Sequence, residues 1–213
     1  MTCLVVAEHD NAELKSSTLS TIMAATQITG DIHVLVAGSN CSAVAEQAAK
    51  VAGVQSVKVA DDAIYAHQLA ESVSTLILSV AEEYSHILAS ATTAGKNVMP
   101  RVSAVLDVAQ ISDVSAVLSE DTFVRPIYAG NAMATVQSLD DKKIITVRSS
   151  TFDKVAAVGG SASIIPISSA PDPNLSTFVS QELSKSERPE LSAAKIVISG
   201  GRGVGSSENF AII

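Results

Sequence analysis

Apolar and polar residues alternate in blocks along the first half of the chain, and the blocks have two different periodicities. Continuous apolar runs, typical of strands covered on both faces of a parallel sheet, occupy residues 3–7, 32–38, 56–60 and 84–91. Between them, apolar residues recur every three or four positions, as on one face of a helix, over residues 14–28, 42–52, 67–82 and 96–107. The alternation predicts an α/β domain with a parallel sheet and right-handed crossovers, its fifth strand at residues 114–118.

The last of these helices contains a proline. We expect it to begin at Lys96, because Pro100 is then in the first turn, where its missing N–H has no partner to lose.

The alternation ends after residue 118. Extended runs at residues 122–128 and 132–137 flank a short Ala-Gly-Asn segment, which predicts a hairpin, and a third run follows at residues 143–148. Three successive strands indicate a small antiparallel annex to the parallel sheet. Residues 149–174, with two adjacent glycines and three prolines, predict an irregular surface passage, and residues 177–183 fit either a strand or a short helix.

A polar, proline-broken stretch at residues 184–190 is the best domain boundary in the chain. We therefore expect an N-terminal α/β scaffold domain over residues 1–183, a linker over 184–192, and the start of a second domain over 193–213. Within that start, residues 196–199 predict a short buried strand.

A glycine-rich turn follows the predicted strand and contains Gly200, Gly201, Gly203 and Gly205. Glycines allow a tight turn with the backbone close to a ligand. Ser206 and Ser207 then open a predicted helix, whose first N–H groups attract anions, and Arg202 adds a permanent cation with a planar face. The segment predicts a diphosphate cradle, although the motif alone fits a nucleotide site and an ordinary turn equally well.

The composition narrows the class of protein. With 47% hydrophobic and 17% charged residues, the chain can bury a large core, and its net charge of −8 argues against nucleic acid or an anionic membrane as partner. No apolar run approaches the roughly 18 residues of a membrane span. Cys3 and Cys41 are far apart, which favours a reducing compartment and no metal site, and the absence of a leader before Leu4 favours the cytoplasm.

Other polar residues are weaker candidates. His9, between Glu8 and Asp10, follows the first strand at an edge where parallel sheets bind ligands, but a polar loop residue is the favoured interpretation, as it is for Asp61 and Asp62. The other histidines, His33, His67 and His86, lack metal-ligand spacing.

Two further motifs are rejected as sites. Ser161 and Ser163 lack the frame of a nucleophilic serine, and Gly95-Lys96 lacks the other residues of a phosphate loop.

Several blocks along the chain resemble the α subunit of electron transfer flavoproteins. They are Gly95-Lys96-Asn97, Pro100-Arg101-Val102, Ile111-Ser112-Asp113, Asp121-Thr122-Phe123-Val124-Arg125, Ile127-Tyr128-Ala129-Gly130-Asn131-Ala132, Arg188-Pro189-Glu190-Leu191, Val197-Ile198-Ser199-Gly200-Gly201-Arg202-Gly203 and Ser207-Glu208-Asn209-Phe210. Because they follow the family's order, they are more specific than the glycine turn by itself.

The resemblance implies an electron carrier without its own substrate, and a heterodimer with a β subunit that holds one FAD per pair. It implies electron transfer from acyl-CoA and related dehydrogenases of fatty acid β-oxidation to a membrane quinone reductase. Arg202 matches the arginine that contacts the flavin in the family, and Gly201, Gly203, Ser206 and Ser207 are lesser FAD-binding candidates.

Family members continue beyond the equivalent of residue 213, so the chain is expected to hold only the first strand and turn of the FAD domain and to retain FAD poorly. A bacterial cytoplasmic location is expected, with the mitochondrial matrix as the alternative. The alternative function is an adenine-nucleotide-binding module, since the predicted sheet is Rossmann-like and resembles nucleotide-hydrolase folds. Against it, the loops after Ala7, Ala37 and Ala60 have no glycine-rich cradle. A hydrolase has no supported nucleophile.

Overall fold

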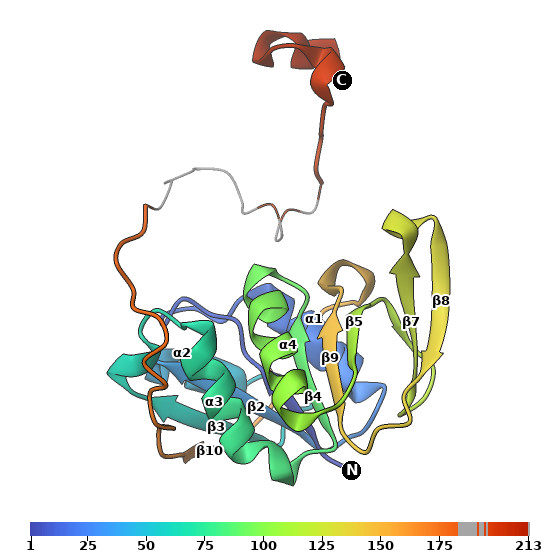
Figure 1. Cartoon of the computed structure of the whole chain (residues 1–213). Coiled ribbons are helices and arrows are strands. Elements are labelled where there is room, and N and C mark those ends of the chain that lie inside the picture. Colours follow the sequence, from blue (N-terminus) through green and yellow to red (C-terminus); the bar gives the residue numbers. More distant parts are fainter. Residues whose placement is uncertain (183–190, 192–193, 195, 213) are drawn as a thin grey trace. The chain divides into compact units, whose positions relative to one another are not determined.

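A seven-stranded sheet with the strand order β10-β3-β2-β1-β4-β9-β5 organises most of the chain (Figure 1). The computed structural model describes residues 1–182, 191, 194 and 196–212. Every neighbouring pair in the sheet is parallel, which confirms the predicted fold class. The strands are β1 (Cys3–Val6), β2 (Ile32–Gly38), β3 (Ser56–Asp61), β4 (His86–Ser90), β5 (Gln110–Val114), β9 (Lys143–Val147) and β10 (Ser163–Pro166).

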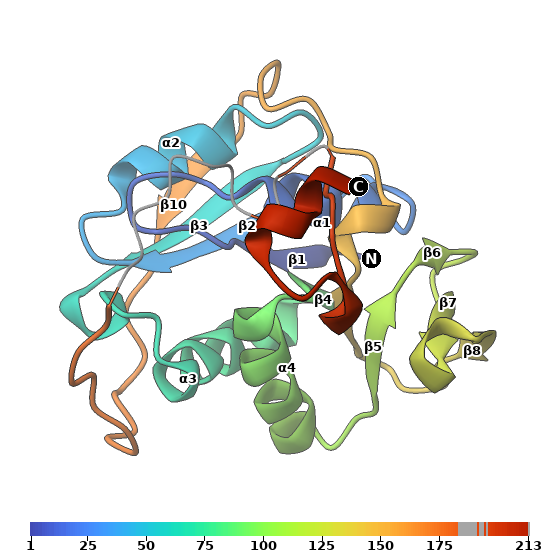
Figure 2. The same ribbon diagram turned by 90° about the horizontal axis from the view of Figure 1, so that it is seen from above.

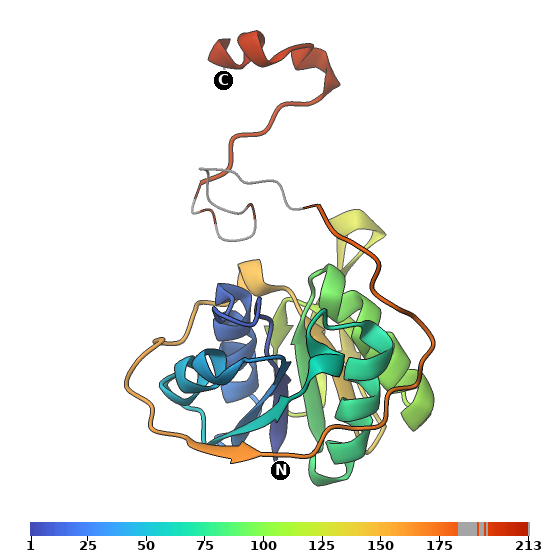
Figure 3. The same cartoon turned by 90° about the vertical axis from the view of Figure 1, so that its left-hand side faces the viewer.

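Helices cover both faces of this sheet, as the continuous apolar runs predict. In Figures 2 and 3, α1 (Ser16–Thr26) and α2 (Ser42–Ala49) lie on one face, and α3 (Ala70–Val80) and α4 (Thr93–Leu106) lie on the other. Successive β1 residues therefore enter different cores. Val5 packs with residues of α1 and α2, whereas Leu4 packs with residues of α3 and α4.

The order of the strands reverses direction between β3 and β4. From β1 the chain moves outward to β2 and β3, and then returns to place β4 on the opposite side of β1. Open parallel sheets commonly bind ligands at the carboxyl ends of the strands beside such a reversal.

The predicted start of α4 was wrong. The helix begins at Thr93, and the Thr92 side chain caps it by accepting a hydrogen bond from the Gly95 N–H at 3.4 Å. Pro100 is therefore inside the helix and not in its first turn. The capping threonine places the first turn three residues earlier than the apolar spacing alone indicated.

A three-stranded antiparallel sheet, which we call the arm, lies beside the parallel sheet. It consists of β6 (Ala116–Val117), β7 (Thr122–Ile127) and β8 (Ala132–Gln137), and the predicted β7–β8 hairpin is confirmed. The fifth strand of the parallel sheet was predicted at residues 114–118, but β5 ends at Val114 and β6 belongs to the arm.

The run at residues 143–148 was expected in the antiparallel annex. It forms β9 instead, between β4 and β5 in the parallel sheet. Its residues explain this position, because Ile144, Ile145, Thr146 and Val147 are all buried and so occupy both faces of the strand.

The passage predicted to be irregular contains β10, which pairs with β3 at the edge of the sheet. All four β10 residues are exposed, so backbone pairing and not burial defines this strand. Residues 177–182 form neither the strand nor the helix considered for them, and residue 183 lies outside the described residues.

By its contacts the chain divides into one unit at Met1–Ser180 and a second at Gln181–Ile213. The strand predicted at residues 196–199 is not formed, since residues 196–200 have no regular secondary structure and pair with no described strand. Short 3₁₀ helices follow at Arg202–Val204 and Ser207–Ile212. The predicted linker at 184–192 falls almost entirely outside the described residues, and the domain boundaries stay a prediction.

Within the described part of the chain, no helix has both the length and the apolar character that crossing a bilayer requires.

Gly95 provides a test of the packing between α4 and β4. An added Cβ would lie 2.0 Å from the Ser90 carbonyl oxygen, so we expect Gly95→Ala to lower the free energy of unfolding by about 1–3 kcal/mol. Chemical denaturation measures this loss. Gly30→Ala is the matched control, because its Cβ meets nothing within 4 Å and its effect should stay within about 0.5 kcal/mol. Equal stabilities of the two variants would contradict the tight contact.

Candidate functional site

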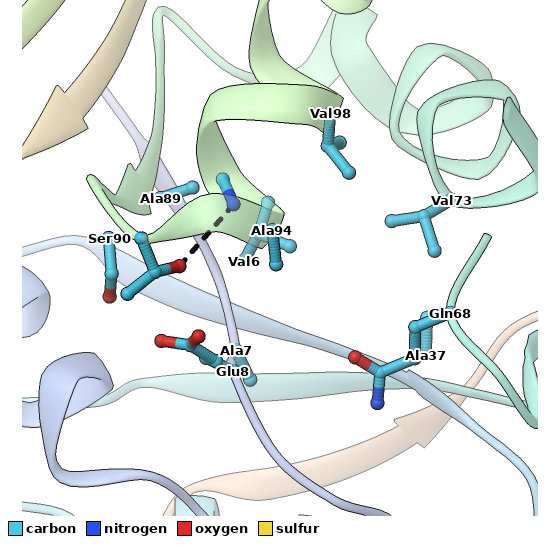
Figure 4. Close-up of a pocket in the computed structure, with 12 residues that line it drawn as sticks. Val6, Ala7, Glu8, Ala37, Gln68, Val73, Ala89, Ser90, Ala94 and Val98 are labelled. Carbon is cyan, nitrogen blue, oxygen red and sulfur yellow. Dashed lines mark hydrogen bonds between the residues drawn. The ribbon is translucent and has the colours of Figure 1, made fainter. Parts of the chain in front are cut away.

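A pocket opens beside the reversal point, at the carboxyl ends of β1 and β4 (Figure 4). Its polar lining comes from Glu8 after β1, Gln68 before α3, Ser90 at the end of β4 and Thr92 just before α4. The remaining lining residues are apolar or glycine: Val6, Ala7, Ala37, Val73, Ala89, Ala94, Gly95 and Val98.

This pocket is poorly suited to a phosphate group. Glu8 contributes a carboxylate, which accepts a hydrogen bond from Ser17 Oγ at 2.5 Å and would repel an anion. The hydroxyl of Thr92 already accepts a hydrogen bond from the Gly95 N–H at the start of α4. The pocket therefore gives no support to the alternative of an adenine-nucleotide module.

His9 connects two loops of the protein through hydrogen bonds. The residue is 6% exposed, and its Nδ1 accepts a hydrogen bond from the Asn11 N–H at 3.1 Å and lies 3.1 Å from Gln68 Nε2. Burial lowers the pKa of His9, so the neutral ring is favoured. The ring holds the loop after β1 against the segment before α3, which agrees with the favoured interpretation of a loop residue.

The two acidic residues after β3 also organise loops. Asp61 accepts hydrogen bonds from the Asn40 and Cys41 N–H groups at 2.7 and 3.2 Å. Asp62 accepts from the Ser169 hydroxyl and the Ile64 N–H, and these bonds lower its pKa. Both carboxylates are thus engaged with the protein itself.

Neither the histidines nor the cysteines form a metal centre in the described structure. No three described His, Cys, Asp or Glu side chains lie together as metal ligands would. Cys3 and Cys41 are both free and buried, and burial raises the pKa of Cys3 to about 12, which makes its thiol unreactive.

The structure brings the residues of the glycine turn together in the second unit. Gly201 precedes the short helix Arg202–Val204, and its carbonyl accepts a hydrogen bond from the Val204 N–H at 3.0 Å. Arg202 is exposed and has no ion-pair partner among the described residues. The Arg202 guanidinium is thus exposed, and its part in a cofactor site stays a prediction.

The two serines after the turn form hydrogen bonds with Glu208. Ser207 Oγ donates to Glu208 Oε1 at 3.4 Å, and hydrogen bonding by Ser206 lowers the pKa of Glu208. A ligand that used these two hydroxyls would have to replace the Glu208 carboxylate.

The family model for the electron transfer flavoprotein domain matches residues 3–172. The chain belongs to the electron transfer flavoprotein family. The matched region lies within the first unit and includes the parallel sheet and the arm. Membership makes this chain an electron-transfer protein, in agreement with the resemblance seen in the sequence.

Individual family members match the whole chain. It is 60% identical over 213 residues to the electron transfer flavoprotein subunit alpha of Pseudomonas aeruginosa and covers 69% of that protein. It is 52% identical to the subunit of the same name from Paracoccus denitrificans, again covering 69%. The mitochondrial subunit of Dictyostelium discoideum is 44% identical over 228 residues, with all of this chain and 64% of that protein covered.

The pKa of His9 leads to a pH prediction. Because the folded-state pKa lies below the ordinary value of 6.5, His9 contributes stability above pH 6.5 that is lost as the pH falls toward the folded-state pKa. Burial also lowers the pKa of His86, which therefore changes the stability with pH in the same direction. We expect His9→Gln to reduce, without abolishing, the dependence of unfolding free energy on pH between 6.5 and about 5. Denaturant titrations across this range test it, and parallel curves for variant and wild type would refute it.

Proposed function

We propose that this chain is the α subunit of a heterodimeric electron transfer flavoprotein and has no substrate of its own. It passes electrons from acyl-CoA and related dehydrogenases to a membrane quinone reductase. The observation that carries the proposal is the 60% identity, over the full chain, to a protein named as this subunit. The chain is similar both to a subunit from a bacterium and to one named as mitochondrial. The proposed compartment is the bacterial cytoplasm, and the mitochondrial matrix is the alternative.

The glycine turn suits FAD as the proposed cofactor. Cβ atoms placed on Gly201 and Gly203 would meet nothing within 4 Å, so the backbone on both sides of Arg202 is open to a ligand. Arg202 offers a planar group of hydrogen-bond donors and a fixed positive charge. Bound FAD supplies the electron-accepting and electron-donating chemistry.

The roles of the chain's own residues follow from their chemistry. Arg202 would stabilise negative charge on the flavin, and Gly201 and Gly203 would let the backbone approach it. Ser206 and Ser207 would donate hydroxyl hydrogen bonds in place of those they make to Glu208.

The outer strand of the arm has features of a surface that a partner subunit would cover. Among the described strands, β8 pairs only with β7, so its other edge presents unpaired backbone groups. Strands at a free edge are usually protected by charges or proline, but β8 reads Ala-Met-Ala-Thr-Val-Gln and has neither. Met133 on β8 and Tyr128 at the hairpin tip are 56% and 81% exposed. An unprotected edge beside exposed apolar groups is typical of a surface that another chain covers.

Reconstitution tests the proposal. The 213-residue chain by itself should be purified without a visible flavin band, because all five proposed FAD residues are exposed. A chain extended to the length of its relatives, mixed with the β subunit of the same organism and FAD, should give a yellow complex reduced by an acyl-CoA dehydrogenase and its substrate. A stoichiometric flavin on the 213-residue chain would contradict the expected poor retention. An extended complex that stays oxidised would contradict the function.

Arg202 provides the sharper test of the site. In the reconstituted heterodimer, Arg202→Ala removes a cation close to developing negative charge, which is worth about 1–3 kcal/mol when partly desolvated. We expect weaker FAD retention and a lower potential for one-electron reduction, measured by flavin release and by redox titration. Arg202→Lys should recover part of the potential, because it keeps the charge. Lys154→Ala, at an exposed position of the first unit, is the control. An unchanged retention and potential in Arg202→Ala would exclude Arg202 from the site.

A further inference from the structure

A cluster of basic side chains lies where the arm meets the parallel sheet. Its centre is Asp113 of β5, which has a left-handed backbone (φ 60°) at an irregularity in the pairing with β9. Arg148, just after β9, donates from Nε and Nη2 to Asp113 Oδ2 at 3.1 and 2.5 Å. This ion pair joins the carboxyl ends of the two neighbouring strands.

Two further cations act on the same carboxylate through their charges, without a hydrogen bond to it. The pKa of Asp113 is lowered first by its hydrogen bonds with Arg148, and then by the charges of Arg148, Lys96 and Arg125. Lys96 comes from the first turns of α4 and Arg125 from β7, so three different elements bring cations to β5. Three cations around one carboxylate leave an excess of positive charge, in a chain whose net charge is −8.

Arg125 lacks an acceptor. Its Nε is buried and makes no hydrogen bond within the described residues. Across the arm, Arg125 is paired with Ala134, whose methyl side chain offers no acceptor. The Arg125 side chain shares a face of the arm with Phe123, which is buried. A buried N–H without a partner destabilises the fold. The residue as a whole is only partly buried, so the rest of its unpaired guanidinium can meet an acceptor from outside the chain.

The surroundings indicate a protein as the source of that acceptor. The tip of the same hairpin holds Tyr128 and Ala129 with φ of 49° and 55°, a left-handed conformation that is unfavourable for both residues. In this conformation Tyr128 is 81% exposed to solvent. Arginine and tyrosine beside an unprotected strand edge make up a typical protein interface, whereas a free anion would be held by surface cations alone.

We propose that Lys96, Arg125 and Arg148 receive a carboxylate side chain of the partner subunit, to which the Arg125 guanidinium donates a hydrogen bond. This inference rests on the proposed heterodimer and adds the chemistry of one contact within it. Asp113 keeps Arg148 in place, and the incoming carboxylate balances the positive charge that Asp113 leaves uncompensated.

The test measures association of the extended chain with the β subunit of the same organism, by calorimetry at several salt concentrations. Arg125→Gln removes the charge and the guanidinium donors, so we expect binding at least about tenfold weaker, with a smaller dependence on salt. Lys154→Gln is the matched control, since it also removes one exposed cation, and it should bind like wild type. Arg125→Lys should restore the salt dependence but only part of the affinity.

A second readout does not depend on the folding of a variant. In the ¹⁵N-labelled wild-type chain, the Arg125 Nε–H resonance should shift when the β subunit is added, and inorganic phosphate at the same concentration should leave it unchanged. Wild-type affinity and salt dependence in Arg125→Gln would overturn the inference while the heterodimer stands. A saturable shift of the Arg125 resonance with phosphate, and none with the subunit, would also overturn the inference. Failure of the wild-type chains to associate would instead overturn the proposed function, and this contact with it.

Discussion

Burial of β1 on both faces is the constraint on which the rest of this structure depends. Cys3, Leu4 and Val5 are completely buried, and β1 is hydrogen-bonded to β2 on one side and to β4 on the other. Because successive side chains point to opposite faces, one short strand contributes to two separate cores. Each core requires its own pair of helices, so the four crossovers are consequences of how the centre of the sheet is covered.

The same constraint places the polar residues at the end of the sheet. Strands with apolar side chains on both faces leave charged residues only where they end. In this chain most of these groups are used internally: His9 and Asp62 each brace a loop, and Glu8 binds Ser17. The carboxyl edge of a parallel sheet is a common place for a ligand, but here it serves mainly to fix the connections between strands and helices.

The sequence predicted the helices and the central strands well, because a buried strand and an amphipathic helix each have a periodicity that can be read directly. Its errors came from pairing between distant segments. β9 has the two-sided apolar pattern of a parallel strand, and it was placed with the hairpin only because it follows the hairpin in the chain. The exposed strand β10 has no such pattern, since its backbone bonds to β3 alone define it.

The candidate sites show the same limit. The glycines and Arg202 stand out as a local motif, whereas the basic cluster joins residues from α4, β5, β7 and the end of β9. No local pattern in the sequence connects those residues. Residues 196–199 have the composition of a buried strand, but composition cannot supply the neighbouring strand that such a segment needs, and they have no regular structure here.

Residues 167–180, which follow β10, would determine how a pulling force on the chain reaches the first unit. After β10, the Ile167 N–H donates to the Val59 carbonyl, the Ala170 N–H donates to the Tyr65 hydroxyl, and Phe178 stacks on His67 with ring centroids 3.5 Å apart. Tension on the chain beyond Ser180 would therefore have to detach these contacts one after another before it reached β3. Since β10 is exposed and β1 is buried, the outermost strand would detach first and the central strands would stay paired.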